Sequence, residues 1–249
     1  MRGLNWRYRL GLIRSLVIYW RPGRQRGLRR LYAGFINPGD RVFDIGAHVG
    51  DRSVAFAALG ARVVALEPQP QLRPLLDYMV EHRSVTVLGD AVGARPGWAE
   101  LAVSPGHPTV SSLSTPWRAA MREAHAGFQR VHWSKTVRVP VVTLDQLIDD
   151  FGQPAFCKID VEGFEEQVLA GLSLPISALS FEFVAGALEA ARRCLDRLSE
   201  LGDYRYNVVA GEARRWRFRD WQDQAALDAW LVQGADGLAS GDVYACLVS

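Results

Sequence analysis

The sequence predicts a single α/β domain whose parallel β-sheet carries helices on both faces. From residue 40 onward, short runs rich in Val, Ile and Phe alternate with segments of helical length. This alternation is typical of a parallel sheet covered by its crossover helices. No stretch rich in Pro, Gly or Ser divides the 249 residues. We therefore expect one domain over residues 37–249, with an insertion at about 97–142, preceded by a basic helical arm over residues 1–36.

The first half of the domain is expected to contain three parallel strands. A turn at Asn37-Pro38-Gly39-Asp40 precedes the first strand, because each of these residue types favours turn conformations. The predicted strands are 41–45, 62–66 and 85–89, and the predicted helices are 51–60 and about 69–81. Asp51 is expected to cap the first helix and Gly60 to end it.

The second half is less regular at its start. The predicted strands are 97–103, 137–142, 155–160, 179–184, 204–210, 214–218 and 242–248. Thr143 is expected to cap a helix that reaches Asp150. Another helix is predicted to start near Gly163, and two more cover about 186–201 and 221–233. Residues 104–135 form a polar stretch in which no helix or strand is predicted.

A glycine-containing loop follows the first predicted strand. Asp44, Gly46 and Gly50 form the pattern D-x-G-x-x-x-G, and Glu67 lies 23 residues after Asp44, just beyond the next strand. This arrangement is typical of a nucleoside-binding site, since glycine lets the backbone approach a ligand and a carboxylate can accept hydrogen bonds from ribose hydroxyls. The predicted ligand contacts in the loop are Asp44, Gly46, Ala47, His48 and Gly50.

Two classes of nucleoside ligand compete for this loop. A dinucleotide requires G-x-G-x-x-G, but Ala47-His48 stands where the second glycine belongs, and Asp44 would repel a pyrophosphate. S-adenosylmethionine has no phosphate, and its sulfonium and amino groups favour a nearby carboxylate. The electrostatics therefore favour S-adenosylmethionine as the cofactor.

The end of the third predicted strand completes the predicted nucleoside site. Asp90 follows that strand, and we expect it near the adenine, where the amide of Ala91 or Val92 can contact the ring edge. His48 is interpreted primarily as a packing residue of the loop, within reach of the cofactor.

The sequence resembles the FkbM-type methyltransferases, a branch of the class I S-adenosylmethionine-dependent enzymes. Three blocks carry the resemblance: 38-PGDRVFDIGAHVGDRSVAFAALGARVVALEP-68, 139-VPVVTLDQLI-148 and 157-CKIDVEGFEEQVLAG-171. It implies a Rossmann-like, mostly parallel sheet of seven strands with an antiparallel last strand, which 242–248 can supply. It also implies methyl transfer to a hydroxyl of a small molecule or glycoconjugate, such as a sugar, a glycolipid or a polyketide-like natural product.

The block 157-CKIDVEGFEE-166 places charges where a strand should be buried. Lys158 and Asp160 are two residues apart and share one face of a strand. Asp160 ends the strand beside the first one, so we expect it near the methyl group of the donor. For methyl transfer to an alcohol, Asp160 is the candidate general base, assisted by Lys158, Glu162 and Glu182.

Two other interpretations of these charges stay open. Lys158, Asp160, Glu162 and Glu182 can form a paired network that only holds two strands together. Alternatively, Asp160 and Glu182 can bind a divalent ion, because carboxylates at the ends of adjacent strands suit oxygen-preferring metals.

The insertion and the tail contain weaker candidates. Ser111-Ser112 resembles a serine pair of the family and can contact the acceptor or lie in a solvated loop. His107, His125 and His132 fit no compact metal motif. Trp216 and Trp221 can stack on a sugar or belong to the core. No Asn/Asp-Pro-Pro-aromatic motif follows residue 160, so no nucleic-acid partner is expected.

Composition and charge limit the remaining classes of function. Three separated cysteines suggest neither a zinc site nor a disulfide framework, so a reducing, cytoplasmic compartment is expected. The run 10–20 is interrupted by Arg14 and is too short to span a bilayer. A nicotinamide-dependent oxidoreductase, or an inactive membrane- or polyanion-docking protein on the same fold, are the alternative functions. The sequence does not indicate an oligomeric state.

The N-terminal arm is the most basic part of the chain. Residues 1–39 contain nine arginines and no acidic residue. Apolar residues recur at spacings of two to four, as in an amphipathic helix, at Leu4, Trp6, Leu10, Ile13, Leu16, Val17 and Trp20. A second short helix is expected over about 24–36. We predict that the arm covers the pocket as a lid that helps select the acceptor, with weak peripheral membrane contact as a secondary prediction.

Overall fold

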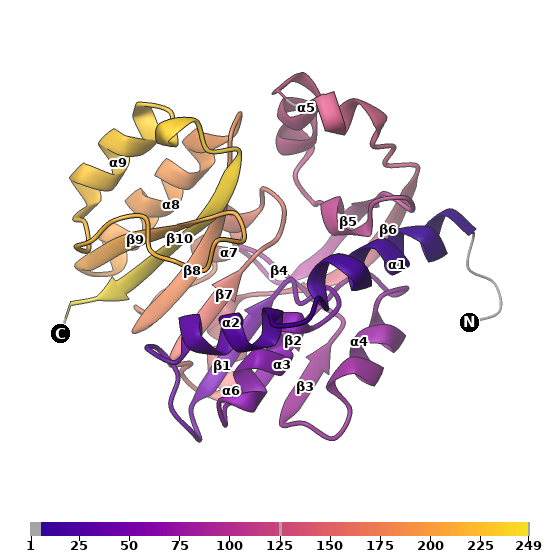
Figure 1. The fold of residues 1–249 in the computed structure, drawn as a ribbon, viewed down its shortest axis with the longest axis horizontal. Helices are drawn as coiled ribbons and strands as arrows, with labels where there is room; N and C mark the ends of the chain where they lie inside the picture. Colours follow the sequence, from indigo (N-terminus) through magenta and orange to yellow (C-terminus); the bar gives the residue numbers. More distant parts are fainter. Residues whose placement is uncertain (1–5, 125, 249) are drawn as a thin grey trace.

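Seven strands form one sheet at the centre of the molecule (Figure 1). The computed structural model describes residues 6–124 and 126–248. Across the sheet the order is β3-β2-β1-β7-β8-β10-β9. In this order the strands are Val85–Leu88, Arg62–Leu66, Arg41–Ile45, Phe156–Ile159, Ala178–Val184, Ser240–Leu247 and Tyr204–Ala210. Strand β10 runs antiparallel to β8 and β9, and the pairs from β3 to β8 are parallel. The predicted seven-stranded sheet with a reversed last strand is confirmed.

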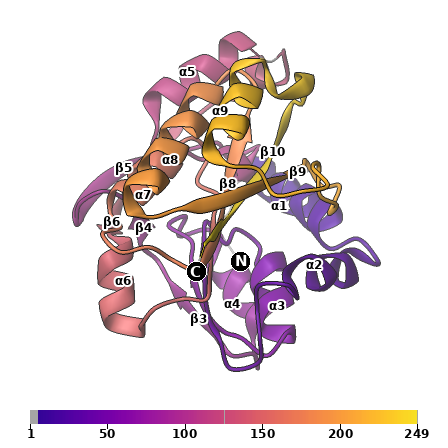
Figure 2. The ribbon, with the colours of Figure 1, turned by 90° about the vertical axis from the view of Figure 1, so that its left-hand side faces the viewer.

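Helices cover both faces of this sheet, which Figure 2 shows as two groups on opposite sides. One face carries α2 (Arg24–Tyr32), α3 (Asp51–Ala58) and α4 (Arg73–Val80). The other carries α6 (Leu144–Phe151), α7 (Glu165–Ala170), α8 (Leu188–Leu201) and α9 (Gln224–Val232). Two apolar clusters fill the space between the helices and the sheet. The strands therefore read as continuous apolar runs because both of their faces are buried.

Charged side chains nevertheless share one face of the central strands. In the register of the sheet, Asp44 on β1 pairs with Lys158 on β7, and Lys158 pairs with Ser180 on β8. Glu182 on β8 pairs with Asp242 on β10. Because residues paired across strands point to the same face, the sheet register aligns these polar groups beneath α2 and α3.

The insertion builds a second, smaller sheet. Its order is β4-β6-β5, with β4 at Ala91–Val92, β5 at Gly97–Val103 and β6 at Lys135–Val142. Between β5 and β6 lie η1 (Pro108–Val110), α5 (Thr115–Ala124) and η2 (Ala126–Arg130). The sequence analysis assigned no element within 104–135, so these helices are revealed by the structure alone. The α5 segment carries Trp117, which packs against the turn at Gly163, so tertiary packing stabilises a helix that the polar sequence did not reveal.

Two local predictions were wrong. Residues 214–218 form no strand, and Trp216 makes only an isolated bridge to Val209. Asp51 does not cap α3, because Gly50 occupies the N-cap and the Asp51 carboxylate accepts a hydrogen bond from Arg24. The predicted cap of α6 is confirmed, since Thr143 forms a capping box with Gln146.

The arm forms two helices, α1 (Trp6–Tyr19) and α2. Leu12 of α1 is buried against Val49 of the glycine loop and Leu72. Helix α1 therefore lies over the glycine loop at the carboxyl ends of the strands (Figure 1). Leu4 lies outside the described residues, and the division into an arm and a domain stays a prediction. Among the described residues, no helix combines the length and apolarity needed to cross a bilayer.

Candidate functional site

A hollow of about 840 Å³ lies beyond the carboxyl ends of β1, β2 and β7. Nearly all the residues predicted for the nucleoside and acceptor sites line it: Asp44, Gly46, Ala47, His48, Glu67, Asp90, Ala91, Lys158, Asp160 and Glu162. Gly50 and Glu182 are absent from the lining. Arm residue Tyr19 and insertion residue Ser111 also contribute to the wall. The parallel strands converge on this pocket because their carboxyl ends meet at one edge of the sheet.

Asp44 is the deepest acid of the pocket, only 1% exposed. The Ser53 hydroxyl donates to one carboxylate oxygen, Oδ2. The other oxygen, Oδ1, is buried without a hydrogen-bond partner among the described residues. Burial raises the pKa of Asp44, while the ammonium of Lys158 and the Ser53 hydrogen bond oppose that rise. A buried acceptor without a partner is unfavourable unless a ligand donor meets it, so Oδ1 suits a cationic amino group.

Glu67 organises the loop and faces the same hollow. Its two carboxylate oxygens accept hydrogen bonds from the backbone amides of His48 and Gln69, both at 2.9 Å. Burial raises the pKa of Glu67 to about 7, although these two amides act in the opposite direction. Each oxygen keeps a second lone pair, so Glu67 can still accept from the two hydroxyls of a ribose.

His48 turns the loop and packs against the arm. Its φ of 51° lies in the left-handed region, and its ring meets the Tyr19 ring edge-on with centroids 5.5 Å apart. Nε2 is buried without a partner in the described part of the chain. Burial lowers the pKa of His48 to about 4, so the imidazole is neutral near pH 7. The prediction that His48 packs within the loop is consistent with this ring contact.

Glycine is required at Gly46 for a packing reason. Its φ is +83°, and a Cβ there would overlap the carbonyl oxygen of Asp160. The loop after β1 thus passes directly over the end of β7, which brings the nucleoside side of the pocket to the acid at 160. Gly50 also has a positive φ, +75°, and begins α3 against Leu76. Gly50 therefore shapes the path of the backbone and does not line the pocket.

Asp160 and Lys158 form an ion pair. The distance from Lys158 Nζ to Asp160 Oδ2 is 2.6 Å, with the lysine side chain 1% exposed and the aspartate side chain 25% exposed. Burial raises the pKa of Asp160, but Lys158 and then Arg52 outweigh that effect and hold the pKa below its usual value. Asp160 is therefore ionised, and its partly exposed side chain lines the pocket.

Glu162 and Glu182 complete an acidic cluster with Asp160. One ligand atom from each of the three lies within 4.8 Å of the other two. Burial, followed by the neighbouring carboxylates, raises the pKa values of Glu162 and Glu182 well above the usual range. The crowding of like charges leaves Asp160 as the member that carries the negative charge. Glu162 has a φ of 54°, and the Ser112 hydroxyl donates to its carbonyl oxygen at 2.6 Å.

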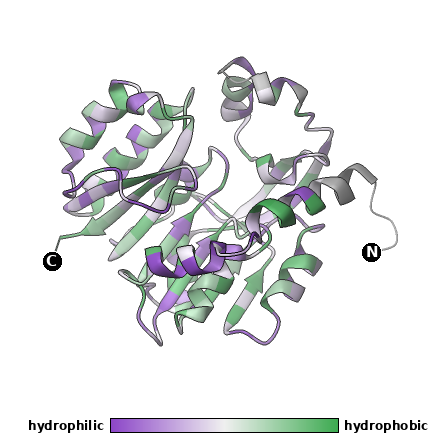
Figure 3. Cartoon of the chain, in the orientation of Figure 1, coloured by the Kyte–Doolittle hydropathy of each residue, from purple (hydrophilic) through white to green (hydrophobic). Residues whose placement is uncertain are grey.

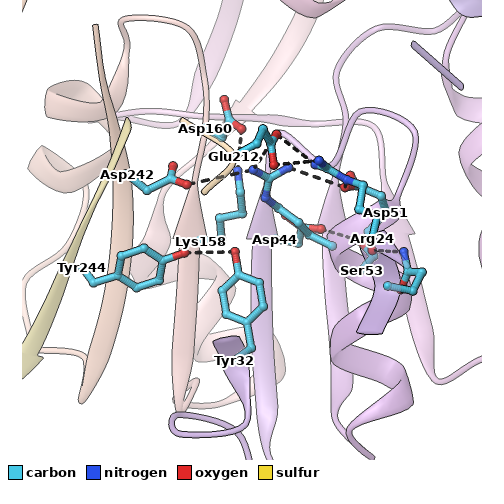
Figure 4. A network of polar contacts seen from close by, with 12 residues as sticks. Arg24, Tyr32, Asp44, Asp51, Ser53, Lys158, Asp160, Glu212, Asp242 and Tyr244 are labelled. Carbon is cyan, nitrogen blue, oxygen red and sulfur yellow. Dashed lines mark hydrogen bonds and ion pairs between the residues drawn. The ribbon is translucent and has the colours of Figure 1, made fainter. Parts of the chain in front are cut away.

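A network of ion pairs, buried except at Glu212, connects the arm to this site (Figure 4). Arg24 of α2 donates to Asp51 at the start of α3 and, through two nitrogens, to Glu212. Arg52, which lines the pocket, lies 3.7 Å from Asp51 and 4.0 Å from Asp242 of β10. Both guanidinium groups stay charged, because the surrounding carboxylates raise their pKa values against the effect of burial. The arm and the glycine loop are thereby held together by charge.

Sequence reasoning missed several residues of the pocket lining, among them Tyr19 and Arg52. Burial and the carboxylates of Asp160 and Glu162 raise the pKa of Tyr19, so its hydroxyl keeps its proton. A charged residue in the first turn after the glycine loop was the available signal for Arg52. No local pattern distinguished Tyr19 from the other apolar residues of the arm.

The remaining candidates lie at different places. Ser111 lines the pocket and donates to Gln69 at 2.8 Å. The rings of Trp216 and Trp221 pack against each other and against Phe35. Neither tryptophan lines the pocket. Trp221 is half-buried in this cluster and fits the core interpretation, whereas Trp216 is 37% exposed. His107 and His132 do not line the pocket, and His125 lies outside the described residues.

The sheet order, the reversed β10 and the glycine-loop pocket define a class I methyltransferase fold. The family model described as the Methyltransferase FkbM domain matches residues 44–233. The chain belongs to this family, and the protein is a methyltransferase. The match includes the glycine loop, Glu67 and the acidic cluster.

At low sequence identity, the chain is similar to solved structures of methyltransferases. The O-methyltransferase from Bacillus cereus in complex with SAH is 11% identical, covering 100% of this chain and 93% of that one, with a TM-score of 0.49. The precorrin-6y C5,15-methyltransferase from Geobacter metallireducens is 13% identical, covering 90% and 87%, with a TM-score of 0.46. No curated protein matches the chain.

Proposed function

We propose that the protein transfers a methyl group from S-adenosylmethionine to a hydroxyl of a small molecule or glycoconjugate. The observation that supports this most is the position of Asp160. An ionised, partly exposed carboxylate faces the same hollow as the nucleoside-binding residues Asp44 and Glu67. Donor and acceptor can thus meet beside one acid.

The pocket fits S-adenosylmethionine by its charges and open acceptors. Asp44 Oδ1 has no partner within the described chain and accepts from the amino group of the methionine part. Glu67 accepts from the ribose hydroxyls, and Asp90 with Ala91 borders the adenine. No basic side chain replaces Asp44 at the loop, which disfavours a dinucleotide pyrophosphate. When bound, the cofactor supplies an activated methyl group on a positively charged sulfur.

Asp160 orients the acceptor and takes its proton. The carboxylate accepts a hydrogen bond from the acceptor hydroxyl, which directs an oxygen lone pair toward the methyl group. Its lowered pKa does not prevent proton transfer, because an alcohol oxygen becomes strongly acidic as it gains a methyl group. Lys158 keeps Asp160 ionised and fixes its position through the 2.6 Å contact. Such a positioned base typically contributes about 10²–10⁴-fold.

A divalent ion is the second candidate for activating the hydroxyl. The ligand atoms of Asp160, Glu162 and Glu182 lie close enough to bind one cation together. Carboxylate oxygens suit Mg²⁺ or Ca²⁺, and a cation would relieve the repulsion that raises the pKa values of both glutamates. The ion pair between Lys158 and Asp160 competes with this site, so we favour the metal-free base.

The arm is proposed to act as a lid that helps select the acceptor. Tyr19 of α1 contributes to the pocket wall and meets the His48 ring. Because the Tyr19 ring covers part of the hollow, an acceptor must contact it or displace it. Its protonated hydroxyl can donate to an acceptor oxygen.

Three measurements test the proposed function. Isothermal titration with S-adenosylhomocysteine should show one site per chain, and a folded sample that does not bind would refute the assignment of the cofactor. Fluorescence enhancement of NADH on mixing would favour the nicotinamide alternative instead. A screen of hydroxylated acceptors with labelled S-adenosylmethionine, run with and without EDTA, identifies the acceptor. Activity that survives EDTA supports Asp160 as a metal-free base, and activity that is lost and then restored by Mg²⁺ supports the cation.

A further inference from the structure

The outward face of α1 exposes apolar side chains that do not pack into the core. Ile13 is 57% exposed and Val17 is 62% exposed. They lie one helical turn apart and therefore on the same face. The opposite face holds Leu12 and Ser15, both buried, and Tyr19, which lines the pocket. Helix α1 is thus apolar on two sides, and only one of them packs against the protein.

Arginines flank this apolar stripe. On a helix of 3.6 residues per turn, Arg14 projects beside Ile13 and Val17. Arg21 lies just beyond the end of α1, and its guanidinium donates to the carbonyl oxygen of Val17. Both arginines are exposed. Neither has a salt bridge within the described residues. An exposed apolar stripe bordered by guanidinium groups that have no carboxylate partner is typical of helices that lie in the interface of an anionic bilayer.

Helix α2 extends the basic surface. Its buried face contains Arg24, Leu28 and Tyr32, while Arg26, Arg29 and Arg30 share the exposed face. Both helices lie on the same side of the sheet in the two views (Figures 1 and 2), and Figure 3 shows the hydrophilic α2 beside the mixed surface of α1. The absence of acidic residues in 1–39 leaves this charge uncompensated within the arm.

We propose that the outward face of α1 and α2 docks the enzyme on an anionic membrane surface, and that the acceptor reaches the pocket from that membrane. Ile13 and Val17 enter the headgroup region, and the five exposed arginines contact lipid phosphates. The second half of the proposal rests on the proposed function. Because the same helix carries Tyr19 on its inner face, docking places the pocket wall next to the bilayer, which suits an amphiphilic acceptor such as a glycolipid.

Vesicle binding tests the docking without any catalytic step. The full chain is sedimented with vesicles of phosphatidylcholine alone and with vesicles that contain 30% phosphatidylglycerol, at low and at high salt. We expect binding only to the anionic vesicles, with loss at high salt because exposed charges are screened. The triple variant Arg26→Gln, Arg29→Gln, Arg30→Gln should weaken binding by about a hundredfold, since each arginine near such a surface contributes about fivefold.

A second variant separates a membrane from a soluble polyanion. Ile13→Ser with Val17→Ser removes the apolar stripe but keeps every charge, so it should lose vesicle binding and keep any binding to heparin. Matched controls are Val232→Ser, 60% exposed on α9, and the exposed Arg95→Gln, and both should bind vesicles like the wild type. S-adenosylhomocysteine binding checks that each variant is folded.

Three outcomes would overturn the docking: equal binding to neutral vesicles, unchanged binding by the serine variant, or a control variant as weak as the arginine variant. Failure of the proposed function has a different signature, since vesicle binding would persist while S-adenosylhomocysteine would not bind. If docking holds, transfer to a lipid-linked acceptor should rise when anionic vesicles present it, and transfer that is equal in detergent would overturn the membrane route of the acceptor.

Discussion

Binding of S-adenosylhomocysteine should depend on pH through Glu67. Its carboxyl has a pKa of about 7 because it is buried. At pH 6 about one tenth of a group with that pKa is ionised, and at pH 8 about nine tenths. The ribose hydroxyls need the ionised acceptor, so affinity should be about tenfold weaker at pH 6 than at pH 8. At pH 7 binding should release about half a proton per site.

Calorimetry measures both quantities. Titrations of S-adenosylhomocysteine at pH 6, 7 and 8, repeated in two buffers of different ionisation enthalpy, give the affinity and the number of protons released. His48 does not contribute in this range, because its pKa is about 4. Glu165 also has a pKa of about 7, but it accepts from the amides of Val161 and Gly163 and does not line the pocket.

The variant Glu67→Gln tests whether Glu67 is the group that makes binding depend on pH. It removes the titrating group, keeps a similar shape and leaves Glu165 in place. We expect weaker binding at pH 8, by about ten- to hundredfold for a lost hydrogen bond to a charged group, and no change in affinity between pH 6 and pH 8. A variant that keeps the wild-type pH dependence would show that another acid is responsible and that Glu67 does not hold the ribose.

Three further predictions concern the acid, the network and the arm. Asp160→Asn should reduce methyl transfer by at least about 100-fold with S-adenosylhomocysteine affinity within about threefold, and a variant with a tenth of the wild-type rate would contradict the role of base. Arg24→Met should lower the free energy of unfolding by about 3 kcal/mol, because Asp51 stays buried without its closest partner. In the control variant Arg29→Met, which changes an exposed arginine of the same helix, the free energy of unfolding measured by denaturation should change little. Deletion of residues 1–22 should leave S-adenosylhomocysteine binding nearly intact and abolish transfer, whereas full transfer by the truncated protein would exclude a lid.

The arm deletion also bears on the membrane. Because residues 1–22 contain Ile13, Val17 and Arg14, the truncated chain should lose vesicle binding together with transfer. Point variants on the outer face separate the two roles, since Ile13→Ser with Val17→Ser leaves Tyr19 and the pocket wall in place. This variant should therefore keep transfer to a water-soluble acceptor.

The convergence of Asp44, Gly46, Glu67 and Asp90 on one pocket was predictable because its determinants are local. Asp44 and Gly46 follow one strand, Glu67 the next and Asp90 the third, and each element was recognisable by its apolar run and its ending. Parallel strands place their carboxyl ends at one edge, so the order of the sheet converts three separate local patterns into one site. The pair of Lys158 and Asp160 followed from their spacing of two residues in a strand.

The sequence did not decide which acidic residues of the cluster line the pocket, whereas the structure does. Glu162 lines the pocket and Glu182 does not, although both contribute ligand atoms to the same cluster. Their raised pKa values depend on burial and on the distances between carboxylates. Neither quantity is encoded in a local pattern, since both arise from the register of β7 against β8.

By itself the sequence determined most helices and strands, the polar residues at the ends of the strands and the excess of arginine in the arm. These features follow from periodicity and turn residues, which act over a few positions. Only the tertiary structure decided which long-range partners those residues meet. Arg24 reaches Asp51 across 27 positions and Glu212 across 188, and it takes Asp51 away from the cap that local chemistry predicted. Tyr19 lines the pocket for the same reason: α1 buries Leu12 against the glycine loop, and that packing turns one face of the arm toward the pocket and leaves the other toward solvent.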